Sequence, residues 1–301
     1  MTAAPMHALY IGRFQPPHHA HLVSALAALG HAPRLTLGLG SANLARSIKN
    51  PWTPQEREQL WRLALVEAGA DPSRVRFCPL PDRFDADAWA ADVRGLFDPS
   101  ERVTLVGYEK DDSSAYLHWF PDWERLVLPQ LEGGLSATEL RRAYFLDGPQ
   151  SPLLPQHLPA ATLPRLREWA QTPDYARLRA EWRAVDAARN LAEQREQLWL
   201  WQDGPDLWLR RRPGPIGAGL WELPGAALSG GAEGRGTLYS GGGRTLTGET
   251  LSWVQLGAPP PELRPGLERV PLAQALAAPR HFYADHGVIV SKLLGAAAGR
   301  P

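Results

Sequence analysis

The sequence has 301 residues, which is enough for two domains, and 44% of them are hydrophobic. Its formal net charge is zero, which excludes a general electrostatic attraction to nucleic acid or to an anionic membrane. Cys78 is the single cysteine, which excludes an internal disulfide and fits a reducing compartment. No apolar run approaches the ~20 residues of a membrane span, and residues 1–5 lack the features of a signal peptide. We therefore expect a cytoplasmic protein.

Short apolar runs alternate with helical patterns over the first half of the chain. The expected strands are residues 8–11, 34–39, 75–80, 103–106 and 126–128, and the expected helices are residues 21–29, 54–68 and 85–96. This alternation predicts an α/β domain with a doubly wound, mostly parallel sheet. Ligands of such sheets bind at the carboxyl ends of the strands.

The first expected strand runs into Gly12, and a turn rich in arginine, proline and histidine follows. Gly12 lets the backbone approach a ligand closely, and the free N–H groups at the start of the next helix favour phosphate. His18 and His21 are three residues apart, so both imidazoles can face the same bound anion. Two histidines alone are more often solvated residues, but Arg13 beside the glycine favours an anion site.

A second polar cluster follows the second expected strand. The guanidinium of Arg46 can bind phosphate oxygens through two parallel N–H donors, and the ammonium of Lys49 can bind them as a point charge. Asn50 and Trp52 suit a base or an amide-bearing ring. Taken alone, this cluster is equally well explained as a solvated loop.

Two further clusters complete the set. Residues 107–117 form a charged segment after the fourth expected strand. Ser136 and Thr138 can cap a helix on which Arg141 lies one turn after Thr138. Each cluster can also be read as a plain charged loop or a capped surface helix. Four such segments at one sheet edge together predict a polyphosphate site.

The second half of the chain has a different composition. Helices are expected at residues 163–170 and 175–192, with a domain boundary near residues 185–192. Residues 198–201 and 207–211 predict a hairpin around Gly204. A glycine-rich stretch with few strong helix formers follows, and residues 285–294 are expected to be helical. These patterns predict a smaller α+β domain.

The segments GRFQPPHHAH, ARSIKNPW, GYEKDDSSAYL and LSATELR resemble, in order and spacing, the motifs of the archaeal-type nicotinamide-mononucleotide (NMN) adenylyltransferases. Within that family the sequence is most similar to bacterial bifunctional proteins in which a Nudix domain follows the transferase. Ala20 replaces the glycine of the family signature GRFQPxHxGH, and Tyr108 replaces a histidine. The resemblance implies a Rossmann-like nucleotidyltransferase domain over residues 1–185 and a Nudix-like domain over residues 192–301.

The resemblance also implies a reaction in which the 5′-phosphate of NMN attacks the α-phosphorus of ATP, giving NAD and pyrophosphate. ATP, NMN and Mg²⁺ bound with ATP are the implied small-molecule partners, and a homo-oligomer is left open. The implied catalytic residues are His18, His21 and Arg141. The implied ATP-binding residues are Gly12, Arg13, Phe14, Gly107, Ser136 and Thr138. The implied NMN-binding residues are Arg46, Lys49, Asn50, Trp52, Trp89, Lys110 and Asp111. Of these, Trp89 would stack on the nicotinamide ring, although it also suits the core side of an amphipathic helix.

Residues 219–225 resemble the opening of a Nudix box, GX5EX7REUXEEXGU, but most of the acidic residues of the box are missing. In the best counterpart, residues 244–251, Thr245 and Gly248 stand at acidic positions and only Glu249 remains. One carboxylate cannot replace a cluster that neutralises several divalent ions. We therefore expect hydrolase activity to be weak or lost, and no confident metal site. The alternative is an ADP-ribose hydrolase site rebuilt from other acids, such as Glu222, Glu262 and Asp285.

Two rival functions remain open. One is a different nucleotidyltransferase of this superfamily that acts on nicotinate mononucleotide, phosphopantetheine or a cytidylyl substrate. Trp52 and Trp89 favour a pyridine nucleotide instead. The other is a nucleotide-binding regulator without catalysis, against which the pair of His18 and His21 together with Arg141 argues.

Overall fold

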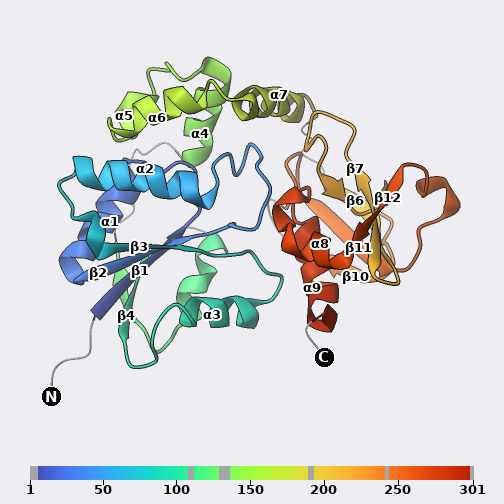
Figure 1. The fold of residues 1–301 in the computed structure, drawn as a ribbon, viewed down its shortest axis with the longest axis horizontal. Coiled ribbons are helices and arrows are strands. Elements are labelled where there is room, and N and C mark those ends of the chain that lie inside the picture. Colours follow the sequence, from blue (N-terminus) through green and yellow to red (C-terminus); the bar gives the residue numbers. More distant parts are fainter. Residues whose placement is uncertain (1–5, 108–111, 129–135, 189–192, 241–243, 299–301) are drawn as a thin grey trace. The chain divides into compact units, whose positions relative to one another are not determined.

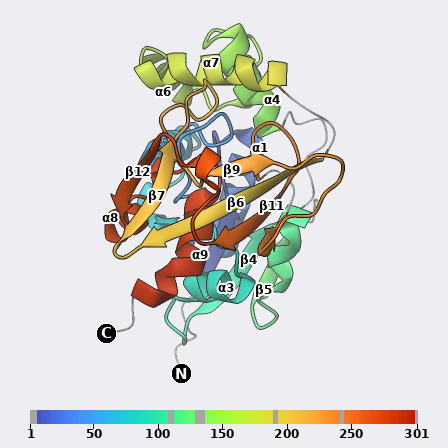
Figure 2. The same cartoon turned by 90° about the vertical axis from the view of Figure 1, so that its right-hand side faces the viewer.

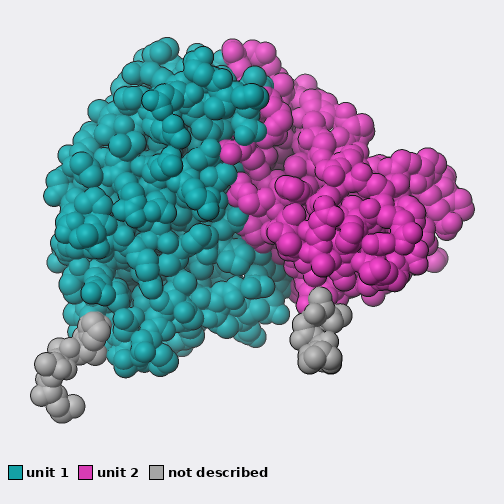
Figure 3. Space-filling view, viewed as in Figure 1, with its two compact units in different colours: residues 1–42, 50–176 teal, residues 43–49, 177–301 magenta. Residues whose placement is uncertain are grey.

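The computed structural model describes residues 6–107, 112–128, 136–188, 193–240 and 244–298 (Figure 1). The chain divides into two compact units, which Figure 3 distinguishes by colour. Unit 1 comprises residues 1–42 and 50–176, and unit 2 comprises residues 43–49 and 177–301. The division therefore falls within α7 (Pro173–Ala188), earlier than the boundary expected at 185–192, and it groups residues 43–49 with the second half of the chain.

Unit 1 contains a five-stranded sheet in the order β3-β2-β1-β4-β5, and every pair in it is parallel. The strands are β1 (Met6–Gly12), β2 (Arg34–Leu39), β3 (Val75–Pro79), β4 (Arg102–Gly107) and β5 (Glu124–Val127). The order reverses beside β1, because β2 and β3 extend to one side and β4 and β5 to the other. This doubly wound topology confirms the predicted Rossmann-like fold, and ligands of such sheets generally bind at the carboxyl ends of the strands where the order reverses, here β1 and β4.

Helices cover both faces of this sheet, as Figure 1 shows for α1 and α2 on one face and α3 on the other. Successive residues of β1 therefore enter different cores. Ala8 and Tyr10 pack in the cluster that contains residues of α1 and α2, while Leu9 and Ile11 pack in the cluster that contains Val93 of α3. The helices of unit 1 are α1 (His19–His31), α2 (Pro54–Glu67), α3 (Ala86–Arg94), α4 (Ala137–Arg142), α5 (Leu154–His157) and α6 (Thr162–Trp169).

The start of α1 corrects one prediction, since the helix begins at His19 and not at His21. His18 is the N-cap residue, with extended backbone angles, and it forms a reciprocal cap with His21. In this cap the backbone N–H of His18 donates to Nδ1 of His21 over 3.3 Å. Histidine is not among the favoured N-cap residues, so the composition of the turn concealed the helix start. Ala20 lies in the first turn of the helix, where its methyl group is partly exposed.

Unit 2 contains a seven-stranded sheet with the main order β10-β11-β6-β7-β12, while β8 pairs with β7 and β9 with β6. Its strands are β6 (Gln194–Asp203), β7 (Asp206–Arg211), β8 (Trp221–Glu222), β9 (Gly225–Ala227), β10 (Thr237–Tyr239), β11 (Thr250–Leu256) and β12 (Leu267–Pro271), and its later helices are α8 (Leu272–Ala277) and α9 (His286–Ala298). Only β6 and β11 pair in parallel among these neighbours. Figure 2 shows β6 as the long strand of this sheet, with β9 and β11 beside it.

The hairpin predicted around Gly204 is confirmed, since Asp203 pairs with Asp206 and Gly204 takes a positive φ of 58°. The glycine-rich stretch forms the short strands β8, β9 and β10, and its described residues contain no helix. Over the described parts of both units, no helix is long and apolar enough to cross a bilayer.

Leu37 offers a test of the core of unit 1. It is fully buried at the centre of β2, between Tyr10 of β1 and Phe77 of β3. We expect Leu37→Ala to lower the free energy of unfolding by about 2–5 kcal/mol, because the change removes buried methyl groups and leaves a cavity. Val66→Ala on the exposed side of α2 is the control, with an expected effect within about 0.5 kcal/mol. Equal shifts in urea unfolding for the two variants would contradict this packing.

Candidate active site

The turn after β1 leads from the carboxyl edge of the sheet to α1. The backbone N–H of Gly40 donates to the carbonyl of Gly12 over 3.0 Å, one step beyond the end of β2. Phe14 has a positive φ of 48°, and its ring folds beneath Gly12. A Cβ atom on Gly12 would lie 2.7 Å from that ring, so the packing of Phe14 requires glycine at this position. Phe14 is 2% exposed, so its ring packs against the turn, and its predicted contact with ATP stays a prediction.

The two histidines predicted to act together lie together. The ring centroids of His18 and His21 are 3.6 Å apart and the rings are inclined by 26°, so the imidazoles are stacked. Phe14 stands perpendicular to His21, with the centroids 5.0 Å apart. Both imidazoles are partly exposed. The cap at the start of α1 and the aromatic ring behind His21 therefore fix both side chains at the helix N-terminus, where the dipole favours an anion.

Arg141 joins α4 to the same turn. Its guanidinium donates to the carbonyl of Gln15 over 2.8 Å and to the hydroxyl of Thr138 over 3.0 Å. The side chain is almost fully buried, and burial, helped by the like charge of Arg13, lowers the pKa of Arg141 to about 9. The group is still cationic at neutral pH. Ser136 caps α4 through a reciprocal bond with Glu139, so its hydroxyl already has a partner in the protein.

Gln15, which was not among the predicted site residues, holds the same turn from another side. Its amide nitrogen donates to the carbonyl of Trp52 over 2.8 Å, and its oxygen accepts the N–H of Trp52 over 3.0 Å. Trp52 is 2% exposed and packs against Tyr144 and Trp169. Its indole therefore packs in an aromatic core, and its predicted role in NMN binding stays a prediction.

Arg57 and Asp82 are also part of this edge and were missed by the sequence analysis. Arg57 of α2 donates to the carbonyls of Arg13 and Gly40, over 2.6 and 2.8 Å. Asp82, after β3, accepts bonds from the N–H and the hydroxyl of Ser41. Burial raises the pKa of Asp82, and the bonds from Ser41 oppose that shift. Both residues lie in ordinary charged patterns, which is why composition alone did not reveal them.

The other residues predicted to bind ATP or NMN lie in different environments. Gly107 ends β4, and a Cβ there would lie 2.9 Å from a terminal methyl of Leu117, which would have to shift to admit it. Trp89 on α3 is partly buried, with ring centroids 5.8 Å from Tyr116 and 5.5 Å from Trp119. Asn50 is buried in unit 1. Lys110 and Asp111 lie outside the described residues.

Arg46 and Lys49, by contrast, belong to unit 2. The amine of Lys49 donates to the carbonyl of Thr245 over 2.6 Å. Beside it, the N–H of Ile48 donates to the carboxylate of Glu181 over 2.9 Å, and the other carboxylate oxygen accepts the N–H of Gly217 over 2.8 Å. Glu181 is fully buried, and burial raises the pKa of its carboxyl. Residues 43–49 are thus fixed within unit 2 by backbone and side-chain bonds.

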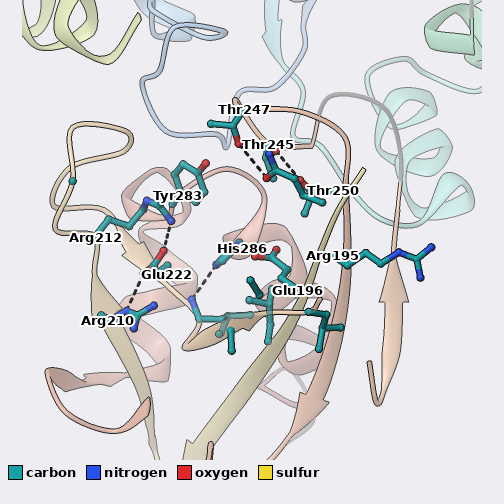
Figure 4. Close-up of a pocket in the computed structure, with 18 of the residues that line it drawn as sticks. Arg195, Glu196, Arg210, Arg212, Glu222, Thr245, Thr247, Thr250, Tyr283 and His286 are labelled. Carbon is teal, nitrogen blue, oxygen red and sulfur yellow. Dashed lines mark hydrogen bonds and ion pairs between the residues drawn. The ribbon is translucent and has the colours of Figure 1, made fainter. Parts of the chain in front are cut away.

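Unit 2 has a pocket of about 710 Å³ lined by residues of β6, β7, β8, β9 and the segment before β11. Figure 4 shows Glu222 between Arg210 and Arg212, and both arginines form ion pairs with it. His286 lies at the base, where its Nδ1 accepts the N–H of Leu223 over 3.0 Å. Burial lowers the pKa of His286, in keeping with a neutral ring that accepts this bond. The charged side chains of this pocket are largely paired with one another.

The acids available in unit 2 do not form a metal cluster. Glu249 is exposed just before β11. Asp285 is paired with Arg244 over 2.6 Å, and Glu222 with its two arginines. Within the described ranges, no group of three or more histidine, cysteine, aspartate or glutamate residues is placed to hold a metal ion. The described residues therefore hold no ready-made cluster of acids like the one that a Nudix reaction uses.

Comparison with known proteins shows the family of the chain. The sequence pattern of the Cytidylyltransferase-like family matches residues 9–143. A nicotinamide/nicotinic acid mononucleotide adenylyltransferase from Acinetobacter baylyi is 32% identical over 184 residues, which are 60% of this chain and 95% of that protein. The chain belongs to the mononucleotide adenylyltransferase family. A nicotinamide-nucleotide adenylyltransferase from Thermococcus onnurineus is also 32% identical, over 50% of this chain and 79% of that protein.

The full chain also has a structural relative outside those shorter adenylyltransferases. The crystal structure of a bifunctional NMN adenylyltransferase/ADP ribose pyrophosphatase from Francisella tularensis superposes with a TM-score of 0.82. The match covers 97% of this chain and 99% of that one at 22% identity, and it shows the fold of both units. The same Francisella protein has been crystallised with AMP and a manganese ion, with a TM-score of 0.81. This adenylyltransferase thus has a second, Nudix-like unit.

Gly12 provides a test of the first turn in this adenylyltransferase. We expect Gly12→Ala to weaken ATP binding by about tenfold or more, equivalent to about 1.4 kcal/mol, because the new methyl group displaces the turn from the buried ring of Phe14. Gly30→Ala, near the end of α1, has nothing within 4 Å of the added carbon and is the matched control. Titration calorimetry with ATP measures both. An unchanged dissociation constant for Gly12→Ala would show that the turn tolerates the displacement.

Proposed function

We propose that this protein transfers the adenylyl group of ATP to NMN, giving NAD and pyrophosphate. In this reaction an oxygen of the NMN 5′-phosphate forms a bond to the α-phosphorus of ATP, and the bond to the pyrophosphate oxygen breaks. The protein supplies no nucleophile in this scheme. It acts by holding the two substrates in line and by stabilising the charge on the transferring group.

The first turn and the start of α1 supply the phosphate-binding groups. Gly12 and Arg13 face the triphosphate, and the N-terminus of α1 adds its free N–H groups and dipole. His18 and His21 donate hydrogen bonds to phosphate oxygens, and Arg141 offsets the negative charge that grows on the α-phosphate and the leaving pyrophosphate. Mg²⁺ enters as part of the substrate MgATP and keeps most of its ligands from phosphate and water.

The position of Arg141 is the observation that carries this proposal. Its cationic guanidinium is buried, yet it is bound to the carbonyl of Gln15 within the turn that carries Arg13. A polyanionic substrate is the partner that makes two neighbouring cations favourable at such a site. Family membership then selects adenylyl transfer among the reactions of polyphosphates. Asn50, Trp52 and Trp89 of unit 1 remain our proposal for NMN recognition.

His21→Ala tests the catalytic part of the proposal. We expect the rate of NAD formation from NMN and ATP to fall by about 10²-fold, because one donor to the transferring phosphoryl group is lost. His31→Ala, at the exposed end of the same helix, should keep the wild-type rate. The absence of NAD with wild-type protein would refute the function, whereas a wild-type rate for His21→Ala would refute only the role of that residue.

Nicotinate mononucleotide is the second candidate substrate, because the Acinetobacter relative is named for both mononucleotides. Parallel assays with NMN and nicotinate mononucleotide at equal ATP decide between them. The substrate with the higher kcat/KM is the one that the site prefers.

For unit 2 we propose a Nudix-like fold with weak or no hydrolase activity. Support comes from the pairing of Glu222 with Arg210 and Arg212, and of Asp285 with Arg244, which leaves these acids compensated within the protein. Glu262 lies in a short, exposed helical turn. Glu249 alone cannot neutralise the ions that such a reaction needs.

Incubation with ADP-ribose and either Mg²⁺ or Mn²⁺ tests this second proposal. We expect no AMP release above the uncatalysed background, because the acidic cluster is absent from the described part of unit 2. Glu249→Gln is the matched variant and should behave as wild type. Rapid AMP release that Glu249→Gln abolishes would overturn the proposal.

A further inference from the structure

Arg57 is the buried cation that the proposed reaction leaves unassigned. It lies in the first turn of α2, and its side chain is 0% exposed. Thr53 and Glu56 fix this turn by a reciprocal cap, with bonds of 3.2 and 2.7 Å. Burying a guanidinium is unfavourable unless its own bonds compensate, and a helix that needed only packing here would carry an apolar residue. The contacts of Arg57 therefore indicate a role beyond the packing of α2.

One nitrogen of Arg57 joins two turns at the carboxyl edge of the sheet. It donates to the carbonyl of Arg13 over 2.6 Å and to the carbonyl of Gly40 over 2.8 Å. Next to these bonds, the N–H of Gly40 donates to the carbonyl of Gly12 over 3.0 Å. Beyond this point the two segments leave the ladder between β1 and β2. Arg57 therefore sets the separation of the two turns where the sheet no longer does.

Asp82 holds the second of these turns from the opposite side. Its carboxylate accepts the N–H of Ser41 over 3.1 Å and the hydroxyl of Ser41 over 2.9 Å. Ser41 has a φ of +53°, which a residue other than glycine keeps only when its surroundings hold it there. Asp82 also interacts electrostatically with Arg13 and Arg57. The two cations and this carboxylate thus form one network around the edge.

We propose that Arg57 is a positioning residue for adenylyl transfer, which acts by fixing the carbonyls of Arg13 and Gly40 and so the place at which Arg13 meets the ATP phosphates. The inference rests on the proposed function. Arg57 does not contact the substrate in this scheme. The exposed side chain of Arg13 reaches the phosphates, and Arg57 determines where the backbone of Arg13 stands.

A graded series at position 57 tests this role: Arg57→Lys, Arg57→Gln and Arg57→Met. We expect the single-turnover rate of NAD formation, per folded molecule, to fall by about 10²-fold in Arg57→Met, since a shift of about 1 Å in a reacting group has that effect. Arg57→Lys should recover most of the rate, because its amine can still donate to both carbonyls, and Arg57→Gln should lie between them. Arg62→Gln, whose side chain is 47% exposed on the same helix, should keep the wild-type rate.

The rate per folded molecule separates positioning from plain stability. If folded Arg57→Lys and Arg57→Gln variants keep the wild-type rate, the inference is overturned, even if their melting temperatures fall. If Arg57→Met does not fold, the rates of these two variants decide the question. A weaker affinity for NMN with unchanged ATP affinity and unchanged rate would also overturn it. A graded loss of rate with retained folding supports it. If the wild-type protein forms no NAD, the proposed function fails first and the inference fails with it.

Discussion

The site depends on hydrogen bonds that buried arginines donate to the backbone of one turn. Residues 13–16 leave the sheet after β1, so their carbonyls lose the ladder partners that strands provide. Arg57 donates to the carbonyl of Arg13, and Arg141 donates to the carbonyl of Gln15. Because these bonds form when the chain folds, the turn does not have to be ordered when a ligand arrives. A turn that is ordered in advance lowers the conformational-entropy cost of binding.

The same arrangement places positive charge in a poorly solvated region. Burial disfavours the charged form of a base, as the lowered pKa of Arg141 illustrates. Asp82 offsets part of this charge, because it interacts electrostatically with Arg13 and Arg57. In the proposed reaction, the polyphosphate of ATP supplies further negative charge. Under that proposal, the free protein carries an electrostatic cost that the substrate removes, which is a common trade between stability and activity.

Much of the fold could be predicted from the sequence because its signals are local. β2 has the predicted bounds, 34–39, since a continuous apolar run marks a strand that is buried on both faces. Contacts between distant residues were not predictable in this way. Phe14 and Trp52 sit inside ligand-binding motifs, yet both rings are buried, because a motif identifies a segment and does not say which side chains point inward. Arg57 was not predicted because it lies in an ordinary charged helix. Its importance comes only from its hydrogen bonds to the carbonyls of Arg13 and Gly40.

The division of the chain within α7 bears on how the protein could be dissected. A shortened chain that ends after α7 would keep every strand of the parallel sheet. It would also keep residues 43–49, together with Glu181. It would lose Thr245, whose carbonyl accepts a hydrogen bond from the amine of Lys49, and Gly217, whose N–H donates to the carboxylate of Glu181. In such a fragment, the buried acid Glu181 would lose half of its N–H donors, and Lys49 would lose its bond to Thr245. The transferase sequence and the Nudix-like sequence are therefore not two independent modules.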